Sequence, residues 1–389
     1  MAFQFDNLDK VISLSLIGFV SFSFFSISLT QISCGVGGLA WMAKCYLTRS
    51  WGKQTFPLKI PFLLFVLACI VAVVGAVDFP GSYKSLKRLL EILIFFWAVN
   101  CINSEVLRER LTLLLIASAT LSTLTSFYTS WETGITHTAR AQGSMSVYMT
   151  YAGLLMLALL LASGKLFFSP KENKWIYIAL TMMSVCLLFT FTRQAWLGVL
   201  AGGVFLIWFR KKNLLWFLPV ILIVIFVISP ASIQWRIKSL INLEDNNLQR
   251  RIALWQGGWL VFKDHPLTGC GFKCIDVVNQ DYPDPTGIIK KLRGMHSNFI
   301  QLAVDTGLFG LISWISIWVV YFMTLYQRFI LMKGDNAYKR DAMGSAAAVV
   351  GFLVAGFFET NFYDSEVSML LYFIMALPFT TNRNKAVLE

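Results

Sequence analysis

Apolar runs of fifteen to twenty residues, with few charges inside them, recur along the whole chain. A helix needs about 20 residues to cross the roughly 30 Å hydrocarbon core of a bilayer. Strands of a membrane β-barrel alternate polar and apolar residues over roughly ten positions instead. The runs therefore exclude a barrel and indicate a bundle of membrane-spanning helices.

The composition supports the same conclusion. The 389 residues are 57% hydrophobic, 15% aromatic and only 14% charged, whereas soluble globular proteins average roughly 45–50% apolar and roughly 25% charged residues. The ordinary counts of 26 glycines and 10 prolines, with only 7 cysteines, exclude collagen, disorder and a small disulfide scaffold. We therefore expect an integral membrane protein.

We expect an all-α polytopic membrane protein with about twelve transmembrane helices. The apolar runs predict spans at 11–29, 33–47, 60–77, 86–102, 111–130, 147–163, 175–191, 195–209, 214–229, 297–327, 343–360 and 366–380. A polar stretch divides the chain into helices 1–9 over residues 1–229, a loop over 230–296 and helices 10–12 over 297–389. The first span lacks an Ala-x-Ala cleavage site, so we expect a retained anchor rather than a signal peptide.

Lys and Arg are distributed unevenly between the two sides of this predicted bundle. With the N-terminus in the cytoplasm, the cytoplasmic segments hold eighteen of them, and the opposite side, apart from the long loop, holds five. Because cytoplasmic loops carry the excess of Lys and Arg, we expect both termini in the cytoplasm and the long loop in the periplasm. The net charge of +12 is then mostly a topological signal, not a nucleic-acid-binding surface.

The loop at 230–296 is the one soluble module, and loops of that length usually carry function. Residues 246–263 have the pattern of an amphipathic helix in which Arg251, Trp255 and Trp259 fall four apart and share one face. Such a helix would lie on the membrane surface, with its tryptophans at the level of the lipid headgroups.

No metal signature is present in the sequence. There is no CxxC pair, HExxH or Asp-x-Asp motif, although Asp78, Glu132 and Asp276 are external acids. Cys270 and Cys274 lie four apart in the external loop, which leaves a local disulfide open in an oxidising compartment. The other five cysteines lie in or beside apolar spans and are expected to be packing residues.

Arginines near the outer ends of hydrophobic spans are costly and are therefore candidate site residues. Arg193 lies in so short a connection between two spans that its guanidinium must stay at the rim of the bundle. Snorkelling to lipid phosphates explains Arg193 equally well. Arg251 has an alternative explanation as an interfacial cation, Arg140 as a loop charge and Arg88 as a cap of the fourth span.

His296 differs from His137 and His265, which have the pattern of ordinary surface or core residues. It lies where the polar loop enters a span, and Ser297 and Asn298 follow it. A neutral imidazole at a membrane–water boundary can accept a proton near neutral pH, which is what activation of a sugar hydroxyl requires. His296 is therefore a candidate general base.

In their order along the chain, these features resemble the O-antigen ligase and polymerase superfamily. The resemblance rests on twelve spans with a large external loop before the tenth. It rests also on Thr192-Arg193-Gln194-Ala195-Trp196, Arg251, Trp255, Pro266-Leu267-Thr268-Gly269-Cys270-Gly271, His296-Ser297-Asn298-Phe299 and Gly307.

The resemblance implies a metal-independent, inverting glycosyltransferase of the GT-C type, without a cofactor, in the bacterial inner membrane. Its donor would be an O-antigen glycan linked to undecaprenyl diphosphate, and its acceptor a sugar of lipid A-core on the periplasmic side, in lipopolysaccharide biosynthesis. Carried over by motif position, the essential residues fall on His296, Arg193 and Arg251. Arg140, Arg88 and Trp255 are candidates for substrate binding.

Simple electrostatics agrees with these assignments. Departure of the leaving group places negative charge on a diphosphate, which guanidinium forks match in a site with little water. Arginine cannot lose its charge there, unlike lysine. Clustered cations would repel a metal ion, so we expect none.

Three alternatives stay open at this point. A polymerase would use a second carrier-linked glycan as acceptor. A protein O-oligosaccharyltransferase is a further alternative, but such relatives usually carry a longer outer region than this chain has. A transporter of lipid-linked glycans belongs to a different class, and would place ionisable residues or broken helices near the membrane midplane. The notable cations of this chain lie at the outer rim instead, which disfavours a transporter. The ligase is favoured over the polymerase because the loop and the histidine motif resemble those of ligases more closely.

Overall fold

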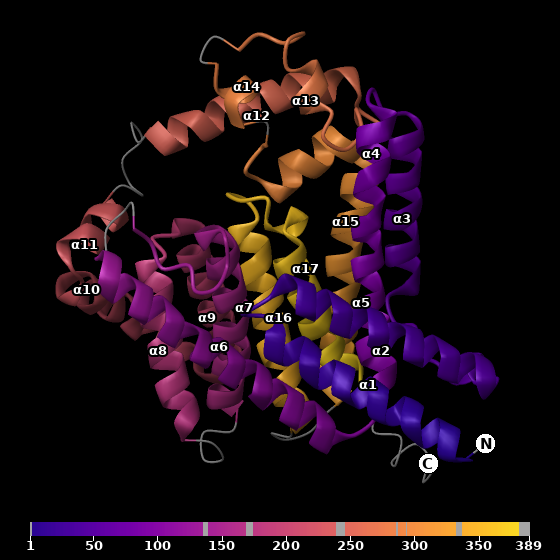
Figure 1. Ribbon diagram of the computed structural model, residues 1–389. Helices are drawn as coiled ribbons and strands as arrows, with labels where there is room; N and C mark the ends of the chain where they lie inside the picture. The colour runs from indigo at the N-terminus through magenta and orange to yellow at the C-terminus, as the bar shows by residue number, and fades with distance from the viewer. Residues whose placement is uncertain are drawn as a thin grey trace.

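The computed structural model describes residues 2–134, 139–168, 174–238, 246–284, 287–292, 294–331 and 337–380, and over these residues the protein is helical with no β-strand (Figure 1). His137 lies outside the described residues. The helices of the bundle are α1 (Ala2–Phe22), α2 (Ile27–Leu47), α3 (Lys59–Val74), α5 (Ile92–Cys101), α6 (Glu105–Thr133), α7 (Tyr148–Phe168), α8 (Trp175–Phe189), α9 (Arg193–Lys211), α10 (Leu218–Ile228), α15 (Asn298–Leu331), α16 (Ala337–Ala355) and α17 (Ser365–Ala376). Each of the predicted apolar segments overlaps one of these helices, although the ends differ, and the segment 11–29 runs past the end of α1 into α2.

Shorter elements connect the bundle helices and form the long loop. They are α4 (Phe79–Ser85), α11 (Ala231–Lys238), α12 (Asn246–Asp264), α13 (Ile275–Val278) and α14 (Ile288–Leu292), with 3-10 turns η1 (Trp51–Lys53), η2 (Leu86–Glu91), η3 (Lys212–Phe217), η4 (Asn361–Tyr363) and η5 (Leu377–Phe379). Helix α12 therefore forms as expected, within one residue of its predicted end. In Figure 1, α12, α13 and α14 lie together over one end of the bundle.

Four helical stretches are long and apolar enough to cross a membrane within the described residues, namely Glu105–Glu132, Tyr148–Phe168, Arg193–Ile228 and Asn298–Arg328. Three shorter apolar helices accompany them at Lys59–Val74, Trp175–Phe189 and Ser365–Phe379. The chain is thus a helical membrane protein. The number of twelve crossings stays a prediction, because several of the predicted spans are shortened by 3-10 turns, such as η2 before α5.

Helix α7 forms the centre of the bundle. Every residue from 150 to 162 is buried, which is typical of a helix that is apolar on all sides and surrounded by others. It packs against α16 and α9, and a Cβ on Gly164 would lie only 2.4 Å from the Cα of Gly344. Small residues at this crossing let the two backbones approach as closely as membrane helices often do.

Helix α10 lies at the opposite extreme. It has no buried residue, and most of its large side chains are exposed, from 37% at Ile225 to 75% at Ile228. A wholly apolar helix with this exposure requires an apolar surrounding. The helix therefore supports burial of this part of the chain in lipid.

Helix α15 is broken at Gly307, whose φ is 62°. The segment 266–271 of the long loop fits into the break, because a Cβ on Gly307 would lie 2.3 Å from the carbonyl oxygen of Leu267. Four backbone hydrogen bonds of 2.9 to 3.2 Å join the two segments, from Cys270 to Val304, Gly271 to Asp305, Leu308 to Pro266 and Phe309 to Leu267. We call this contact the loop joint.

The structure also joins Cys270 and Cys274 in a disulfide, with Cα atoms 5.7 Å apart. Both cysteines are fully buried beside the loop joint. The pairing that the sequence left open is therefore made, and it closes a short turn before α13.

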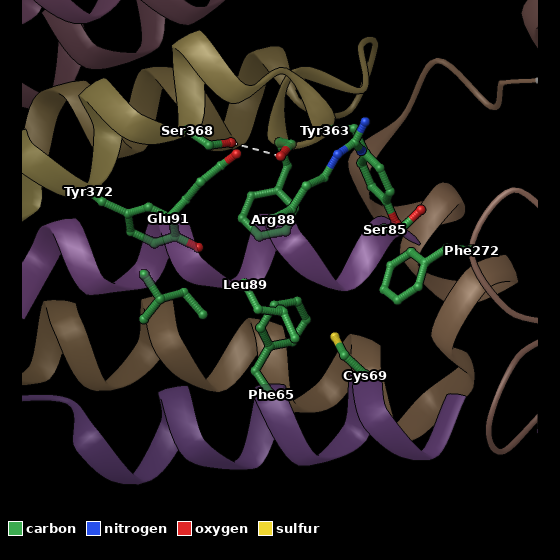
Figure 2. A pocket seen from close by; sticks show the side chains of 12 residues that line it. Phe65, Cys69, Ser85, Arg88, Leu89, Glu91, Phe272, Tyr363, Ser368 and Tyr372 are labelled. Atoms are coloured by element: carbon green, nitrogen blue, oxygen red, sulfur yellow. Dashed lines mark hydrogen bonds between the residues drawn. The ribbon is translucent and has the colours of Figure 1, made fainter. Parts of the chain in front are cut away.

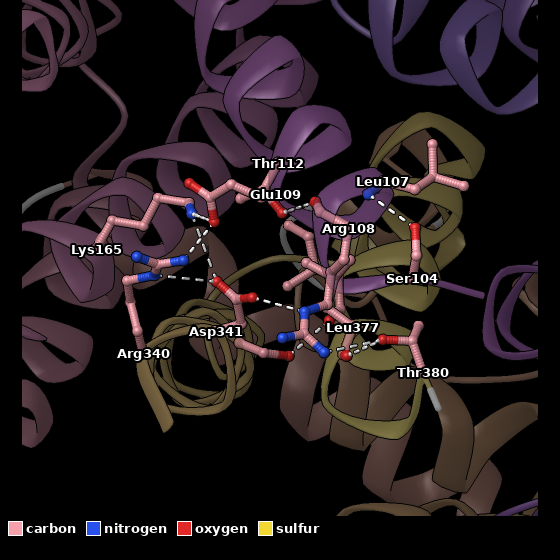
Figure 3. A network of polar contacts seen from close by, with 12 residues as sticks. Ser104, Leu107, Arg108, Glu109, Thr112, Lys165, Arg340, Asp341, Leu377 and Thr380 are labelled. Atoms are coloured by element: carbon pink, nitrogen blue, oxygen red, sulfur yellow. Dashed lines mark hydrogen bonds and ion pairs between the residues drawn. The ribbon is translucent and has the colours of Figure 1, made fainter. Parts of the chain in front are cut away.

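A buried network of ion pairs lies at the end of the bundle where α6 and α16 begin and α7 ends (Figure 3). Asp341 accepts a hydrogen bond of 2.8 Å from Arg108 Nε and lies 3.5 Å from Lys165 Nζ. Glu109 binds Lys165 at 2.5 Å and also contacts Arg340. These cations belong to the predicted cytoplasmic set, so part of the topological signal also stabilises the packing of three helices.

Candidate active site

The turn between α8 and α9 places Arg193 at the first position of α9. Phe191 adopts a left-handed backbone with φ of 51°, which is unfavourable for a bulky residue. Hydrogen bonds hold the turn: Thr192 N–H binds Thr190 Oγ1 at 3.3 Å, and the indole of Trp196 donates to Leu187 O at 3.0 Å. The Thr-Arg-Gln-Ala-Trp motif therefore forms a hydrogen-bonded turn that fixes the position of Arg193 at the start of α9.

Helices α11 and α12 approach this corner from the long loop. Arg236 of α11 donates from Nε to the carbonyl of Phe191 at 3.2 Å, and Arg250 and Arg251 lie near the start of α12. Arg140, from the loop before α7, stacks over the ring of Tyr148 at 4.3 Å. Arginines from four separate segments thus converge.

They line one cavity of about 190 Å³. Its lining consists of Arg140, Tyr148, Met149, Phe191, Thr192, Arg193, Gln194, Arg236, Asn247, Arg250, Arg251, Leu254, Leu292 and His296. We call it the arginine cavity. Of the described residues that line it, five are arginines and none is a carboxylate, which suits a ligand with several negative charges.

His296 lies at the edge of the arginine cavity in a left-handed backbone conformation, with φ of 46°. A non-glycine residue in this region stores strain that the surroundings must offset, and such residues cluster at functional sites. The imidazole Nδ1 lies 3.1 Å from Oε1 of Glu359. Within the described part of the chain, Nε2 has no hydrogen-bond partner, so it is the nitrogen that can meet a ligand.

Glu359, between α16 and η4, contacts His296 and two further residues that line the arginine cavity. Its Oε2 accepts a hydrogen bond of 3.1 Å from Gln194 and lies 3.9 Å from Arg251 Nη2. Burial raises the pKa of the carboxyl, but the hydrogen bond and charge of His296, the charge of Arg251 and the N–H of Thr360 outweigh burial, so the pKa lies below its ordinary value. Glu359 is therefore ionised at neutral pH.

Arg88 lies outside the arginine cavity. Its guanidinium is 5.4 Å from the ring centre of Tyr363, and Figure 2 shows the two side chains next to each other. Both line a small cavity of about 30 Å³. Arg88 also lines an open cavity of about 480 Å³ on the far side of Glu359, together with Thr150, Asn361, Asp364 and Glu366 among others. We call this the second cavity.

Trp255 does not line the arginine cavity either. Its indole Nε1 donates a hydrogen bond of 2.9 Å to the carbonyl of Met295, and its ring packs against Phe358. The structure therefore brings together Arg193, Arg251, Arg140 and His296, and places Arg88 and Trp255 beside them.

No group of three His, Cys, Asp or Glu residues that could hold a metal ion occurs among the residues described. Of the acids that the sequence predicts to be external, neither Asp78 nor Asp276 lines the arginine cavity. Asp78 caps α4 by accepting a hydrogen bond from Gly81 N–H, and Asp276 lines a further cavity of about 250 Å³ with Arg88 and Lys273.

Residues 178–315 match the model of the O-antigen ligase family. This stretch contains Arg193, Arg251, His296 and the loop joint, and it belongs to that family, which confirms the resemblance. No curated protein matches the chain. The protein is thus a helical membrane protein that resembles the O-antigen ligase family over residues 178–315.

Sequence reasoning missed Glu359, Arg236, Arg250 and Gln194. Gln194 stood inside the quoted motif, and Arg250 next to Arg251, so both had a positional signal. Glu359 is 63 residues beyond His296 and lies outside the family match. Only the fold brings it to the site.

Proposed function

We propose that the protein is an O-antigen ligase of the GT-C type that transfers a glycan from undecaprenyl diphosphate to a sugar hydroxyl of lipid A-core. The observation that carries this proposal is the convergence of five arginines on one cavity with the His296–Glu359 pair at its edge. An anionic diphosphate fits the cavity, and a base beside it fits proton removal from a hydroxyl.

In the proposed reaction, Nε2 of His296 takes the proton of the acceptor hydroxyl. The hydroxyl oxygen forms a bond to the anomeric carbon while the bond from that carbon to the phosphate oxygen breaks, which inverts the configuration. The electron pair leaves with the polyprenyl diphosphate, whose charge Arg193 and Arg251 stabilise. Glu359 holds the Nδ1 proton and stabilises the imidazolium that forms.

The two cavities suit the two substrates. The arginine cavity takes the diphosphate, with Arg140 near the first sugars. The lining of the second cavity includes the carboxylates of Glu359 and Glu366, which repel a second diphosphate. Its hydroxyls and the amide of Asn361 can hydrogen-bond sugar hydroxyls. A neutral sugar acceptor next to Glu359 favours the ligase over a polymerase, whose acceptor carries its own diphosphate.

The site lies on the periplasmic side in this proposal, with residues 230–296 outside and both termini in the cytoplasm of an inner-membrane protein. Lys212→Cys and Lys290→Cys in a cysteine-free background test it with an impermeant reagent on intact spheroplasts. Position 290 should react and position 212 should not. The opposite pattern would reverse the orientation.

Deletion of the gene tests the reaction itself, with the lipopolysaccharide separated on a gel. Loss of a ligase leaves core without long glycan, and plasmid-borne wild type restores it. Core that carries one repeat would identify a polymerase, and precursor trapped inside the cell would identify a transporter.

A further inference from the structure

Met295, directly before His296, is fixed at both of its backbone hydrogen-bonding groups. Its N–H donates to Oε1 of Gln301 at 2.9 Å, and its carbonyl accepts from the indole of Trp255 at 2.9 Å. The side chain of Met295 is fully buried, and its sulfur lies against Gly258 of α12. This residue has no freedom to rotate without breaking one of these contacts.

Gln301 is itself held in place. Its Nε2 donates to Asp305 Oδ1 at 3.0 Å, and the other oxygen of Asp305 accepts from the hydroxyl of Tyr363 at 2.7 Å. Asp305 is only 1% exposed. A buried network in which every member has a partner is rigid, so Gln301 presents its amide oxygen at a fixed place.

The other side of His296 is held as firmly. The N–H of Asn298 donates to Gly356 O at 2.7 Å, and its side chain binds Asn361 and the N–H of Phe362. Those contacts tie the turn at His296 to the segment that carries Glu359. The unfavourable φ of His296 is therefore imposed by its neighbours.

We infer that Trp255 and Gln301 are positioning residues for His296. Gln301 holds the backbone N–H of Met295 and Trp255 holds its carbonyl. Together they keep the backbone of His296 in the conformation that places the imidazole between Glu359 and the arginine cavity. The inference rests on the proposed function of His296 as the base. It gives Trp255 a role different from the substrate contact that the resemblance implies.

Trp255→Phe tests this with little loss of packing, because the ring against Phe358 stays and only the donor to Met295 is removed. Trp259→Phe is the matched control. Trp259 lies one turn further along α12, is 58% exposed and stacks on Phe262, and its indole N–H bonds to no residue that the structure describes. Both variants are purified in detergent and assayed with lipid-linked donor and lipid A-core.

We expect Trp255→Phe to lower kcat about tenfold, the effect of losing one hydrogen bond of ordinary strength, while donor Kd and acceptor KM stay within about twofold of wild type. Trp259→Phe should match wild type in all three. Equal kcat for the two variants would overturn the inference. Weaker donor or acceptor binding with unchanged kcat would show that Trp255 contacts substrate instead.

Gln301→Met supplies an independent measurement, since it removes the hydrogen bond to the backbone N–H of the same residue. If both residues act through Met295, the double variant loses about tenfold in kcat rather than about a hundredfold, because the backbone of Met295 is already released by the first change. If the loss of kcat in the double variant equalled the product of the two single losses, the two residues would not act through Met295 alone. A wild-type enzyme that binds donor but transfers nothing would refute the proposed function instead.

Discussion

Nδ1 of His296 and Oε1 of Glu359 lie 3.1 Å apart, although 63 residues separate them in sequence. The contact fixes the tautomer of the imidazole when Glu359 is ionised, because a carboxylate can only accept a hydrogen bond there. The proton then resides on Nδ1, and Nε2 is left with a lone pair toward the arginine cavity. This is the orientation that a general base needs.

His296→Gln should lower transfer by about 10²–10⁴-fold, the usual contribution of a general base, while donor binding persists. Glu359→Gln should retain more activity, because the imidazole stays and only its orientation and charge partner are lost. Transfer rates and donor Kd are measured across pH, and the acid limb of the wild-type profile should vanish in His296→Gln. Near-normal transfer by His296→Gln at neutral pH would remove the base from the mechanism.

Arg193→Lys and Arg251→Lys should each weaken donor binding and turnover, by about tenfold or more. Lysine keeps the charge but lacks the planar fork that matches two phosphate oxygens. Lys263→Arg, near the other end of α12, is a control for general effects of basic substitutions. If both lysine variants transferred like wild type, only net positive charge would be required.

Transfer should survive EDTA. The arginines already neutralise the diphosphate, so the reaction needs no divalent ion for that purpose. Purified enzyme is assayed with chelator and then with added magnesium or manganese. Activity that disappears with chelator and returns with either ion would reverse this expectation.

The raised pKa of Asp364 should make the stability of the folded protein depend on pH. Burial raises the pKa of Asp364, and the nearby carboxylates Glu366 and Glu359 raise it too, whereas the hydrogen bond from Thr150 lowers it. The pKa that results is about 8. The folded state therefore prefers the protonated acid, and the stability that this preference gives is lost progressively as pH rises from the ordinary pKa of 3.8 to about 8. Asp364→Asn should therefore raise Tm relative to wild type by more at pH 9 than at pH 6. An equal difference in Tm at both pH values would contradict the shift.

Asp341→Asn should be strongly destabilising. Asp341 is 1% exposed and is the partner of Arg108 and Lys165, and removal of one member of a buried pair costs about 3–5 kcal/mol. Thermal unfolding in detergent measures the change, with Asp6→Asn as the control because Asp6 pairs with Lys10 at an exposed position. If the two variants unfolded at the same temperature, the network would contribute little.

The helices were predictable because long apolar runs report burial in lipid directly. The break of α15 at Gly307 was not, since hydropathy carries no information on backbone dihedrals. Arg193, Arg251 and His296 were identified from their place at the outer rim and from the resemblance. Glu359 could not be identified from the sequence, because a single acid near a helix end has no distinctive pattern. Its partners come together only through packing.

The loop joint also sets an order for biogenesis. Residues 266–271 leave the ribosome before residues 304–309, so the N–H groups of Cys270 and Gly271 have no partner in α15 until that helix is synthesised. Unpaired backbone groups of this kind disfavour a buried, settled loop. The segment 266–271 must therefore wait for the following helix before it can reach its final structure.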